Sequence, residues 1–370
     1  MRCRHRYTTS TERGLPDFPW DSLAPYAEKA RAHPDGIVDL SVGTPVDATP
    51  EVIRRALADA ADAPGYPLTA GSPALREAIA GWLQRRFAAT VDPAAILPVI
   101  GTKELVAWLP TLLEAASVGY PSLAYPTYDV GARLAAAKGS VVDATVAVGP
   151  ARLDLLWLNS PSNPTGKVLP PEHLRKVADW ARDRGTVVAS DECYADIYYG
   201  EELPVSVLSP EVCGGVHDGL LAVHSLSKRS NLAGYRAGFL AGDPALVAQL
   251  LEVRKHAGMI VPGPVQAAMI AALGDDEHVV AQRNRYQSRR AVLLAALRDA
   301  GFTVDDTGAG LYLWSTRDED CWETVGWLAG RGILAAPGSF YGTAGTRHVR
   351  IALTATDERI AAAADRLVRA

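Results

Sequence analysis

Lys228 is the residue whose surroundings point most directly to chemistry. Two apolar runs of strand length, at 220–224 and 236–241, flank it, so we expect this lysine at the end of a strand. Burial removes the hydration that favours a charged amine, which lowers its pKa and leaves a neutral nucleophile that can attack a carbonyl. Taken alone, the same pattern also fits a solvated lysine in a loop.

Donors suited to a phosphate group lie close to this lysine in the sequence. Ser225 and Ser227 offer hydroxyls, and Arg236 offers a guanidinium whose planar geometry matches phosphate oxygens. An amine that attacks a carbonyl, next to a phosphate site, is the combination that pyridoxal phosphate requires. The hypothesis of a cofactor site therefore rests on whether other motifs support it.

A second anion site is predicted at the start of a helix. The apolar run 96–100 reads as a strand, and an apolar helix is expected over 105–116. Gly101, Thr102 and Lys103 lie between them. The free N–H groups and the dipole of a first helical turn attract an anion there. One glycine makes this a weak signal.

Polar side chains also follow two further predicted strands. The segment reads as a strand at 153–158, an Asn- and Pro-rich loop at 159–166, a helix at 170–184 and a strand at 186–190. Asn163 lies in the loop, and Asp191 ends the second strand, with Tyr194 three residues later. Strand, helix, strand implies a parallel sheet, whose ligands bind beyond the carboxyl ends of the strands. We expect Asn163, Asp191 and Lys228 to meet there.

Four more residues are candidates, and each has a plain structural alternative. Tyr125 at a strand end can cover a flat heterocycle or belong to the core. Tyr66, in a glycine-bracketed loop, can offer its hydroxyl to a ligand or serve as a turn aromatic. Gly43 lies where a backbone can approach a ligand closely, and a plain turn fits as well. Arg350 alternates with apolar neighbours, so it faces either a structural carboxylate or an anionic ligand.

The composition is that of a globular protein with room for two domains. Of its 370 residues 48% are apolar and 21% are charged. The net charge of -5, without long charged runs, argues against nucleic acid and gives no reason to invoke a membrane surface. The cysteines lack zinc-like or CxxC spacing, which indicates reduced thiols in a cytoplasm, no disulfide and no metal. They are Cys3, Cys193, Cys213 and Cys321.

Residues 1–14 are predicted to form a flexible arm. They are basic but lack the apolar core and cleavage site of a secretory signal, so we expect no export. The apolar helix at 105–116 is interrupted by Pro110 and Glu114, and no segment approaches the ~18 apolar residues that a membrane helix requires. A soluble protein is therefore expected.

The remaining elements are predicted from apolar periodicity and capping residues. We expect strands at 37–42, 311–315 and 348–353 and a long helix at 276–300. Thr49 with Pro50, and Ser72 with Pro73, are predicted to cap and open two helices.

Four motifs in series carry a family resemblance. Asn163-Pro164-Thr165-Gly166, Asp191-x-x-Tyr194, Ser225-x-Ser227-Lys228 and Arg236 occur in this order. From about Trp20 to the C-terminus the chain resembles the class I aminotransferases, which are fold-type I enzymes that use pyridoxal 5'-phosphate. The resemblance implies an α/β fold with a large domain at 45–275, whose mostly parallel sheet is flanked by helices. A smaller α+β domain is implied at 15–44 and 276–370.

The same resemblance implies a role for each candidate. Lys228 would hold the cofactor aldehyde as an imine and, once freed, would move a proton between substrate and cofactor. Asp191 would pair with the pyridine nitrogen, Asn163 and Tyr194 would donate to the phenolic oxygen of the ring, and Tyr125 would stack on its face. The phosphate would be held by Ser225, Ser227, Arg236 and the N–H groups at Gly101, Thr102 and Lys103.

Substrates and partners follow from the resemblance as well. Arg350, with Gly43 and Asn163, matches the positions that bind a substrate α-carboxylate, a bidentate task that lysine cannot copy. Tyr66 matches a tyrosine that reaches the cofactor phosphate of the neighbouring subunit, which implies a homodimer with shared active sites. The partners would be amino acids and 2-oxo acids.

Within the family, segments 39–47, 108–111 and 224–239 are most similar to actinobacterial N-succinyldiaminopimelate aminotransferases. This implies glutamate as donor, N-succinyl-2-amino-6-oxopimelate as acceptor and N-succinyl-LL-diaminopimelate as product, in lysine and diaminopimelate biosynthesis. Aspartate-type members carry an arginine just before the Pro-rich loop, here 261–264, whereas this chain offers Arg254, Lys255 and His256 in shifted register. How it reads a distal carboxylate stays open.

Two other functions compete with transamination. A lyase, racemase or decarboxylase, or a transaminase of a specialised pathway, would use the same lysine and aspartate, because the site decides the fate of the carbanion. An effector-binding regulator on an aminotransferase-like domain would need a DNA-binding domain. Only about twenty residues precede the matched region, too few for a helix-turn-helix unit.

Overall fold

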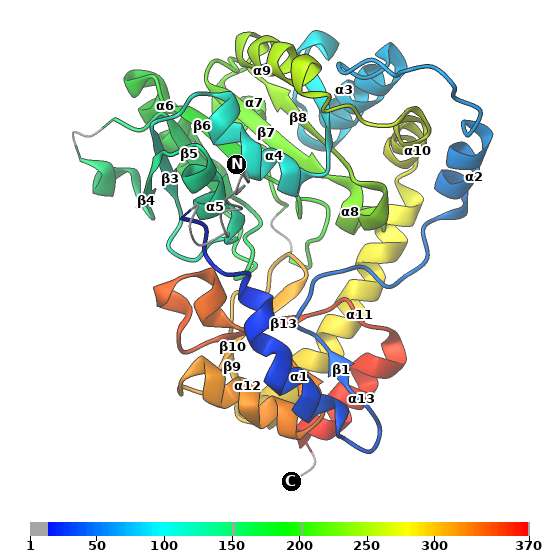
Figure 1. Ribbon diagram of the computed structural model, residues 1–370, viewed down its shortest axis with the longest axis vertical. Helices are drawn as coiled ribbons and strands as arrows, with labels where there is room; N and C mark the ends of the chain where they lie inside the picture. The colour runs from blue at the N-terminus through cyan, green and yellow to red at the C-terminus, as the bar shows by residue number, and fades with distance from the viewer. Residues whose placement is uncertain (1–13, 150–151, 201–202, 369–370) are drawn as a thin grey trace, which may run out of the picture.

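The computed structural model describes residues 14–149, 152–200 and 203–368 (Figure 1). Apart from Gly14, the predicted N-terminal arm lies outside these residues. Figure 1 shows a broad part that contains a large sheet and a narrower part that contains both the first helix and the last. The long helix α11 (Glu277–Asp299) runs from the first part into the second.

A seven-stranded sheet forms the centre of the broad part. Its strands lie in the order β2 (Ile96–Ile100), β8 (Ala237–Gly242), β7 (Leu220–Ser225), β6 (Val187–Asp191), β5 (Leu155–Asn159), β3 (Ser117–Tyr120) and β4 (Lys138–Val141). The neighbours from β7 to β4 pair in parallel, whereas β8 is antiparallel to both β2 and β7. The predicted mostly parallel sheet is confirmed, with β8 as the exception among its inner strands.

Helices cover both faces of this sheet, which explains why β5 and β7 are continuously apolar rather than alternating. One face carries α4 (Thr102–Leu112), α5 (Thr127–Leu134) and α9 (Pro244–Ala257). The other carries α3 (Pro73–Phe87), α6 (Pro171–Arg184) and α10 (Gly263–Gly274). Leu155 and Trp157 pack into the first layer, and Leu156 and Leu158 pack into the second.

The narrower part has its own hydrophobic cluster. A four-stranded antiparallel sheet has the order β12 (Ala336–Pro337), β13 (Val349–Ala352), β10 (Tyr312–Thr316) and β9 (Thr303–Asp305). β1 (Val38–Asp39) pairs in parallel with β11 (Ile333–Leu334). Helices α1 (Ala24–Arg31), α11, α12 (Cys321–Gly330) and α13 (Asp357–Val368) enclose them. The exact boundaries of two domains stay a prediction.

Several predicted boundaries need correction. The remaining helices are α2 (Glu51–Asp59), α7 (Pro210–Cys213) and α8 (Leu226–Arg229). Ser72 caps α3 as expected, but Thr49 does not cap α2; its hydroxyl donates instead to the carbonyl of Asn231. The helix expected at 105–116 begins at Thr102 and ends at Leu112, and the strand expected at 37–42 pairs over two residues only. In both cases tertiary contacts outweigh the local apolar pattern.

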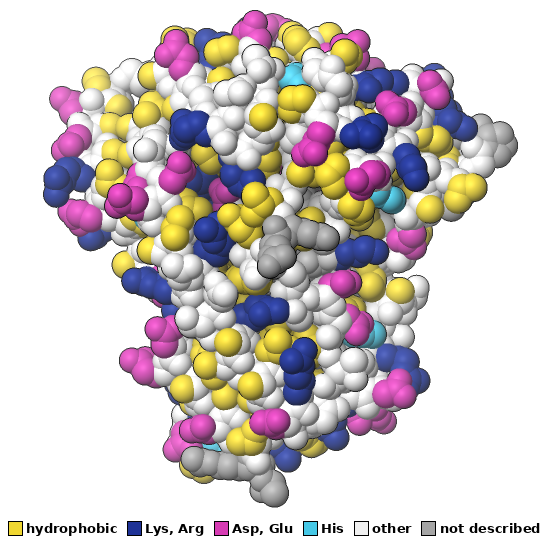
Figure 2. Space-filling model, turned by 180° about the vertical axis from the view of Figure 1, so that it is seen from behind, with side chains coloured by type: hydrophobic (Ala, Val, Ile, Leu, Met, Phe, Trp, Pro, Cys, Tyr) yellow, Lys and Arg dark blue, Asp and Glu magenta, His cyan; other side chains and the backbone are white. Residues whose placement is uncertain are grey.

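Charged side chains of both signs are interspersed over the face in Figure 2, with no extended field of one sign. Within the part of the chain that the structure describes, no helix is long and apolar enough to cross a membrane. Cys193, Cys213 and Cys321 carry free thiols.

Candidate active site

A cavity of about 830 Å³ opens beyond the carboxyl ends of β5, β6 and β7. Most of the residues that the sequence nominated line it: Gly43, Thr102, Lys103, Tyr125, Asn163, Asp191, Tyr194, Ser225, Ser227, Lys228, Arg236 and Arg350. Gly101 and Tyr66 do not. Gly101 lies behind the Arg236 side chain, and Tyr66 is 98% exposed, away from the cavity wall.

Lys228 lies in the short helix α8, which follows β7 directly, rather than in an open loop. The Ser225 hydroxyl accepts a hydrogen bond from the N–H of Ser227 at 3.1 Å, which caps this turn. The Lys228 amine donates to the carbonyl of Gly43. Burial lowers the pKa of this amine, which the nearby Tyr312 phenol partly offsets. The lysine is therefore poised toward its neutral, nucleophilic form.

Asp191 ends β6 and is almost fully buried. One of its oxygens accepts from the Tyr128 hydroxyl at 2.8 Å, and the other accepts from the N–H of Cys193 at 3.2 Å. Burial raises the pKa of this carboxyl, and these donors act in the opposite direction. The side chain is therefore held in one orientation and is largely shielded from solvent.

Sequence reasoning missed Tyr128. This residue is fully buried in α5 and stacks on Trp157, with 5.0 Å between ring centroids. In the sequence, a buried aromatic on an amphipathic helix cannot be distinguished from an ordinary core residue. The hydrogen bond to Asp191 depends on how α5 packs across the sheet, which no local pattern reveals.

Arg350 points inward from β13 and is only 3% exposed. Its guanidinium donates to the Asn163 side-chain oxygen at 3.0 Å and to the carbonyl of Ser41 at 2.7 Å, while its Nε has no partner. The Tyr312 ring lies 3.8 Å from the guanidinium carbon. No carboxylate is bonded to it among the described residues, so an anionic ligand fits better than a structural ion pair.

Tyr312 is a second residue that the sequence did not reveal. Its hydroxyl lies 3.1 Å from the hydroxyl of Tyr194. Burial acts to raise the pKa of this phenol, but the charges of Arg350 and Lys228 outweigh burial and lower the pKa. The alternation of side chains along a strand could have indicated this residue. Arg350 pairs with Trp314 of β10, and Tyr312, two residues before Trp314, lies on the same face of the strand as Trp314.

Of the predicted phosphate donors, Thr102, Lys103 and Arg236 lie at the N-terminus of α4, whereas Ser225 and Ser227 lie at the end of β7 and in α8 on the same cavity. The N–H of Gly101 is not free, because it donates to the carbonyl of Val99 at 2.8 Å. Gly101 has a φ of 73°, which favours glycine, and a Cβ there would collide with the Arg236 guanidinium. Arg236 is exposed, has a φ of 58° and donates to the carbonyl of Ala233 at 3.0 Å. The free N–H groups of Thr102 and Lys103 and this guanidinium form a cradle for an anion.

An aromatic wall with one cation forms another side of the cavity. Phe18 and Trp20 lie 5.6 Å apart, and the Lys103 amine lies 5.5 Å from the Phe18 ring. Arg254, one of the residues that could bind a distal carboxylate of the substrate, is fully buried. It pairs with Glu104 at 2.9 and 3.1 Å. It does not line the cavity, and instead ties α9 to the first turn of α4.

Cys193 also lines the cavity, beside the carboxylate of Asp191. Its thiol lies 3.3 Å from the Thr102 hydroxyl. Burial, and then the charge of Asp191, raise the pKa of this thiol well above its usual range. The thiol therefore stays protonated and serves as part of the cavity wall.

Known proteins share this sequence and this arrangement. Residues 35–367 match the family described as aminotransferase class I and II. The 4-dedimethylamino-4-oxo-anhydrotetracycline transaminase OxyQ of Streptomyces rimosus is 62% identical, over 96% of this chain and 99% of its own. A probable aminotransferase of Mycobacterium tuberculosis, Rv1178, is 63% identical, over 95% of this chain and 85% of its own.

A solved structure agrees with these matches. The N-succinyldiaminopimelate aminotransferase of Mycobacterium tuberculosis has a TM-score of 0.87 and 25% identity, covering 98% of this chain and 99% of that one. Such enzymes act on amino acids and oxo acids and depend on pyridoxal phosphate. The chain belongs to the class I and II aminotransferases.

Proposed function

We propose that this aminotransferase moves an amino group from glutamate to N-succinyl-2-amino-6-oxopimelate, forming N-succinyl-LL-diaminopimelate. The observation that carries the proposal is Arg350, a buried guanidinium with an unpartnered Nε in the cavity. Donor and acceptor share an α-carboxylate, which a guanidinium binds in bidentate fashion. The similarity to the mycobacterial N-succinyldiaminopimelate aminotransferase supports this choice of acceptor.

The cavity residues fit pyridoxal phosphate. We assign the covalent attachment to Lys228, the pyridine nitrogen to Asp191, the phenolic oxygen to Asn163 and Tyr194, and one ring face to Tyr125. The cradle that a Cβ at Gly101 would fill suits the phosphate, with Arg236, Ser225, Ser227 and the N–H groups of Thr102 and Lys103 as donors. When bound, the cofactor supplies an electron sink for charge at the substrate Cα.

The residues of the chain then have separate tasks. Arg350 orients the substrate by its α-carboxylate and Lys228 moves the proton at the substrate Cα, a task that a lowered pKa favours. Asp191, buried and held by Tyr128, keeps a proton on the pyridine nitrogen. Tyr312 keeps the Tyr194 hydroxyl in place.

A second acceptor deserves the same test, because the relative OxyQ is named for a 4-oxo-anhydrotetracycline. The wall formed by Phe18 and Trp20 supports this alternative, since Trp20 also packs on Phe340 at 5.3 Å between centroids. A wall of aromatic rings suits a polycyclic ketone. Glutamate remains the donor in both cases, so Arg350 keeps its task.

Steady-state assays with a panel of acceptors test the proposal. Glutamate is the donor throughout, and the acceptors are the succinylated oxopimelate, the 4-oxo-anhydrotetracycline and simple 2-oxo acids. We expect the highest kcat/KM with the succinylated acceptor. A value for another acceptor that exceeds it tenfold, roughly 1.4 kcal/mol in transition-state binding, would contradict the assignment.

We further propose a homodimer in which each subunit completes the site of the other. Tyr66 is 98% exposed and Leu68 is 62% exposed in the described chain, which suits a contact with a second copy. Mixing a Tyr66→Phe chain with a Lys228→Ala chain yields hybrid dimers with one site that carries neither change. Restored activity is expected; hybrid dimers that form without it would contradict shared sites.

A further inference from the structure

The segment 40–49 touches both the predicted substrate arginine and the predicted catalytic lysine. The carbonyl of Ser41 accepts from Arg350, and the carbonyl of Gly43 accepts from the Lys228 amine. Gly43 has no room for a side chain, because a Cβ would collide with the Tyr312 hydroxyl. The backbone of this segment therefore lies directly against the groups that are expected to do the chemistry.

The two ends of the segment are held in different ways. At its start, Leu40 is fixed by backbone hydrogen bonds to Leu334 at 2.8 Å and to Ala352 at 2.9 Å. Close to its end, Asp47 is held by side chains alone. The Gly43 carbonyl lies between these two anchors, and the Thr354 hydroxyl also holds the neighbouring Val42 carbonyl at 2.9 Å. The Asp47 anchor is the one on the C-terminal side of Gly43.

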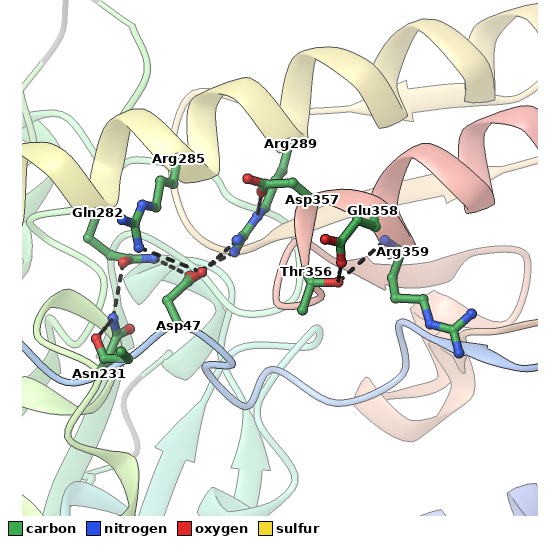
Figure 3. Close-up of polar contacts among 10 residues, drawn as sticks. Asp47, Asn231, Gln282, Arg285, Arg289, Thr356, Asp357, Glu358 and Arg359 are labelled. Atoms are coloured by element: carbon green, nitrogen blue, oxygen red, sulfur yellow. Dashed lines mark hydrogen bonds and ion pairs between the residues drawn. The ribbon is translucent and has the colours of Figure 1, made fainter.

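Figure 3 shows how the carboxylate of Asp47 is held by α11. Arg289 donates to both of its oxygens, at 2.6 and 2.8 Å, and Gln282 donates at 2.7 Å. Arg289 is 3% exposed and the Asp47 side chain is 10% exposed. A buried bidentate pair of this kind fixes geometry, because leaving either charge unpaired is unfavourable.

A further set of contacts joins the segment to the loop that follows Lys228. Asn231, three residues after the lysine, donates to the carbonyl of Ala48 at 3.3 Å and to Gln282 at 3.0 Å. Its own carbonyl accepts from the Thr49 hydroxyl at 3.1 Å. Asp47, Asn231 and α11 therefore form one polar network next to α8.

We propose that Asp47 and Arg289 are positioning residues for Lys228: their ion pair holds the segment 40–49 so that the Gly43 carbonyl faces the lysine amine. Neither side chain lines the cavity, so both act through the backbone. The Ser41 carbonyl is held independently by the pairing of Leu40, so Arg350 keeps its place if Asp47 is released. The inference rests on the proposed role of Lys228 and not on the identity of the acceptor.

The test compares Asp47→Asn with Asp357→Asn in the full chain. Asp357 accepts from the Nε of the same arginine at 2.6 Å but is 77% exposed and does not touch the segment, so it is a matched control. Cofactor-free protein is exposed to pyridoxal phosphate and borohydride over a pH range, and the adduct at Lys228 is quantified by mass spectrometry. The titratable groups around this amine are unchanged in both variants, namely the Tyr312 phenol, the Cys193 thiol and the guanidinium groups of Arg350 and Arg236.

In Asp47→Asn we expect the apparent pKa of Lys228 to fall by about 0.5 or more, because a carbonyl acceptor that stabilises the ammonium is lost. With cofactor bound, kcat should fall about tenfold while the glutamate KM changes less than about threefold, since Arg350 stays in place. Asp357→Asn should change neither quantity.

Thr49→Val decides the case if Asp47→Asn does not fold, because it loosens the same segment without leaving a buried charge unpaired. Thr49→Val should lower the pKa of Lys228 by less than Asp47→Asn does. A folded Asp47→Asn or Thr49→Val protein with unchanged pKa and kcat would overturn the inference, as would kcat and KM that change together. Adduct on a different lysine in the unchanged protein would overturn the role of Lys228 itself.

Discussion

Two arginines line the same cavity under very different conditions. Arg350 is 3% exposed, lies on a strand and packs against Tyr312, whereas Arg236 is exposed and adopts a φ of 58° in a loop. The segments around Arg350 come from residues distant in sequence, such as Ser41 and Asn163. Arg236 also meets a segment distant in sequence, Gly101 at the start of α4, but its only hydrogen bond among the described residues is local, to the carbonyl of Ala233.

Under the proposed function, the two arginines would bind two different kinds of anion. A buried arginine that is fixed by distant segments suits a carboxylate that must be held in one orientation and then released. An exposed arginine at a helix N-terminus suits a phosphate, because several N–H groups also bind the negative phosphate and the arginine supplies only part of the binding free energy. Changes at Arg350 should therefore have larger effects than changes at Arg236.

Arg350→Lys gives the largest expected effect. The ammonium cannot reproduce the bidentate contact, so a buried carboxylate loses a partner at a cost of about 2 to 5 kcal/mol. The kcat/KM for glutamate and for the acceptor should fall together. Arg347→Lys is a matched control, because this arginine is 58% exposed and pairs with the exposed Asp318. A normal kcat/KM for either substrate in Arg350→Lys would remove the assigned role.

Gly101→Ala should have the next largest effect. The added Cβ strains a φ of 73° and displaces the Arg236 guanidinium, so cofactor affinity should fall by about 1 to 3 kcal/mol. Equilibrium binding of pyridoxal phosphate to the cofactor-free protein measures it. Gly214→Ala separates the two causes, because Gly214 has a φ of 66° with open space around it. Equal cofactor affinity in both variants would show that the cradle at Gly101 is unimportant.

Arg236→Lys should have the smallest effect. The side chain is exposed and the charge is retained, so the affinity for pyridoxal phosphate should fall about tenfold or less. Added salt should weaken binding further in both proteins, since exposed charges are screened. Titration at low and high ionic strength checks this. A loss beyond about a hundredfold that salt leaves unchanged would contradict the contrast with Arg350.

The local parts of the fold and of the cavity could be predicted from the sequence. Continuous apolar runs gave the strands that end near Asn163 and Asp191, and Ser225 and Gly101 marked the turns that follow. These features depend on residues adjacent in sequence. They are therefore visible as patterns.

The rest depends on packing between distant segments. Tyr128 meets Asp191 only because α5 covers one face of the sheet, and Tyr312 meets Tyr194 only because β10 approaches from the narrower part. The anchoring of Asp47 by Arg289 joins residues 242 positions apart. For the same reason Thr49 contacts Asn231 rather than capping a helix.

Mapping the lysine that binds the cofactor tests the central claim most directly. Borohydride reduction of the protein with bound pyridoxal phosphate should place the adduct on Lys228, and Lys228→Ala should abolish it. Because burial lowers the pKa of the free amine, adduct formation by cofactor-free protein given pyridoxal phosphate should rise with pH and reach its midpoint below the ~10.4 of an ordinary lysine. An adduct on Lys103 or Lys255, or one that persists in Lys228→Ala, would contradict the account.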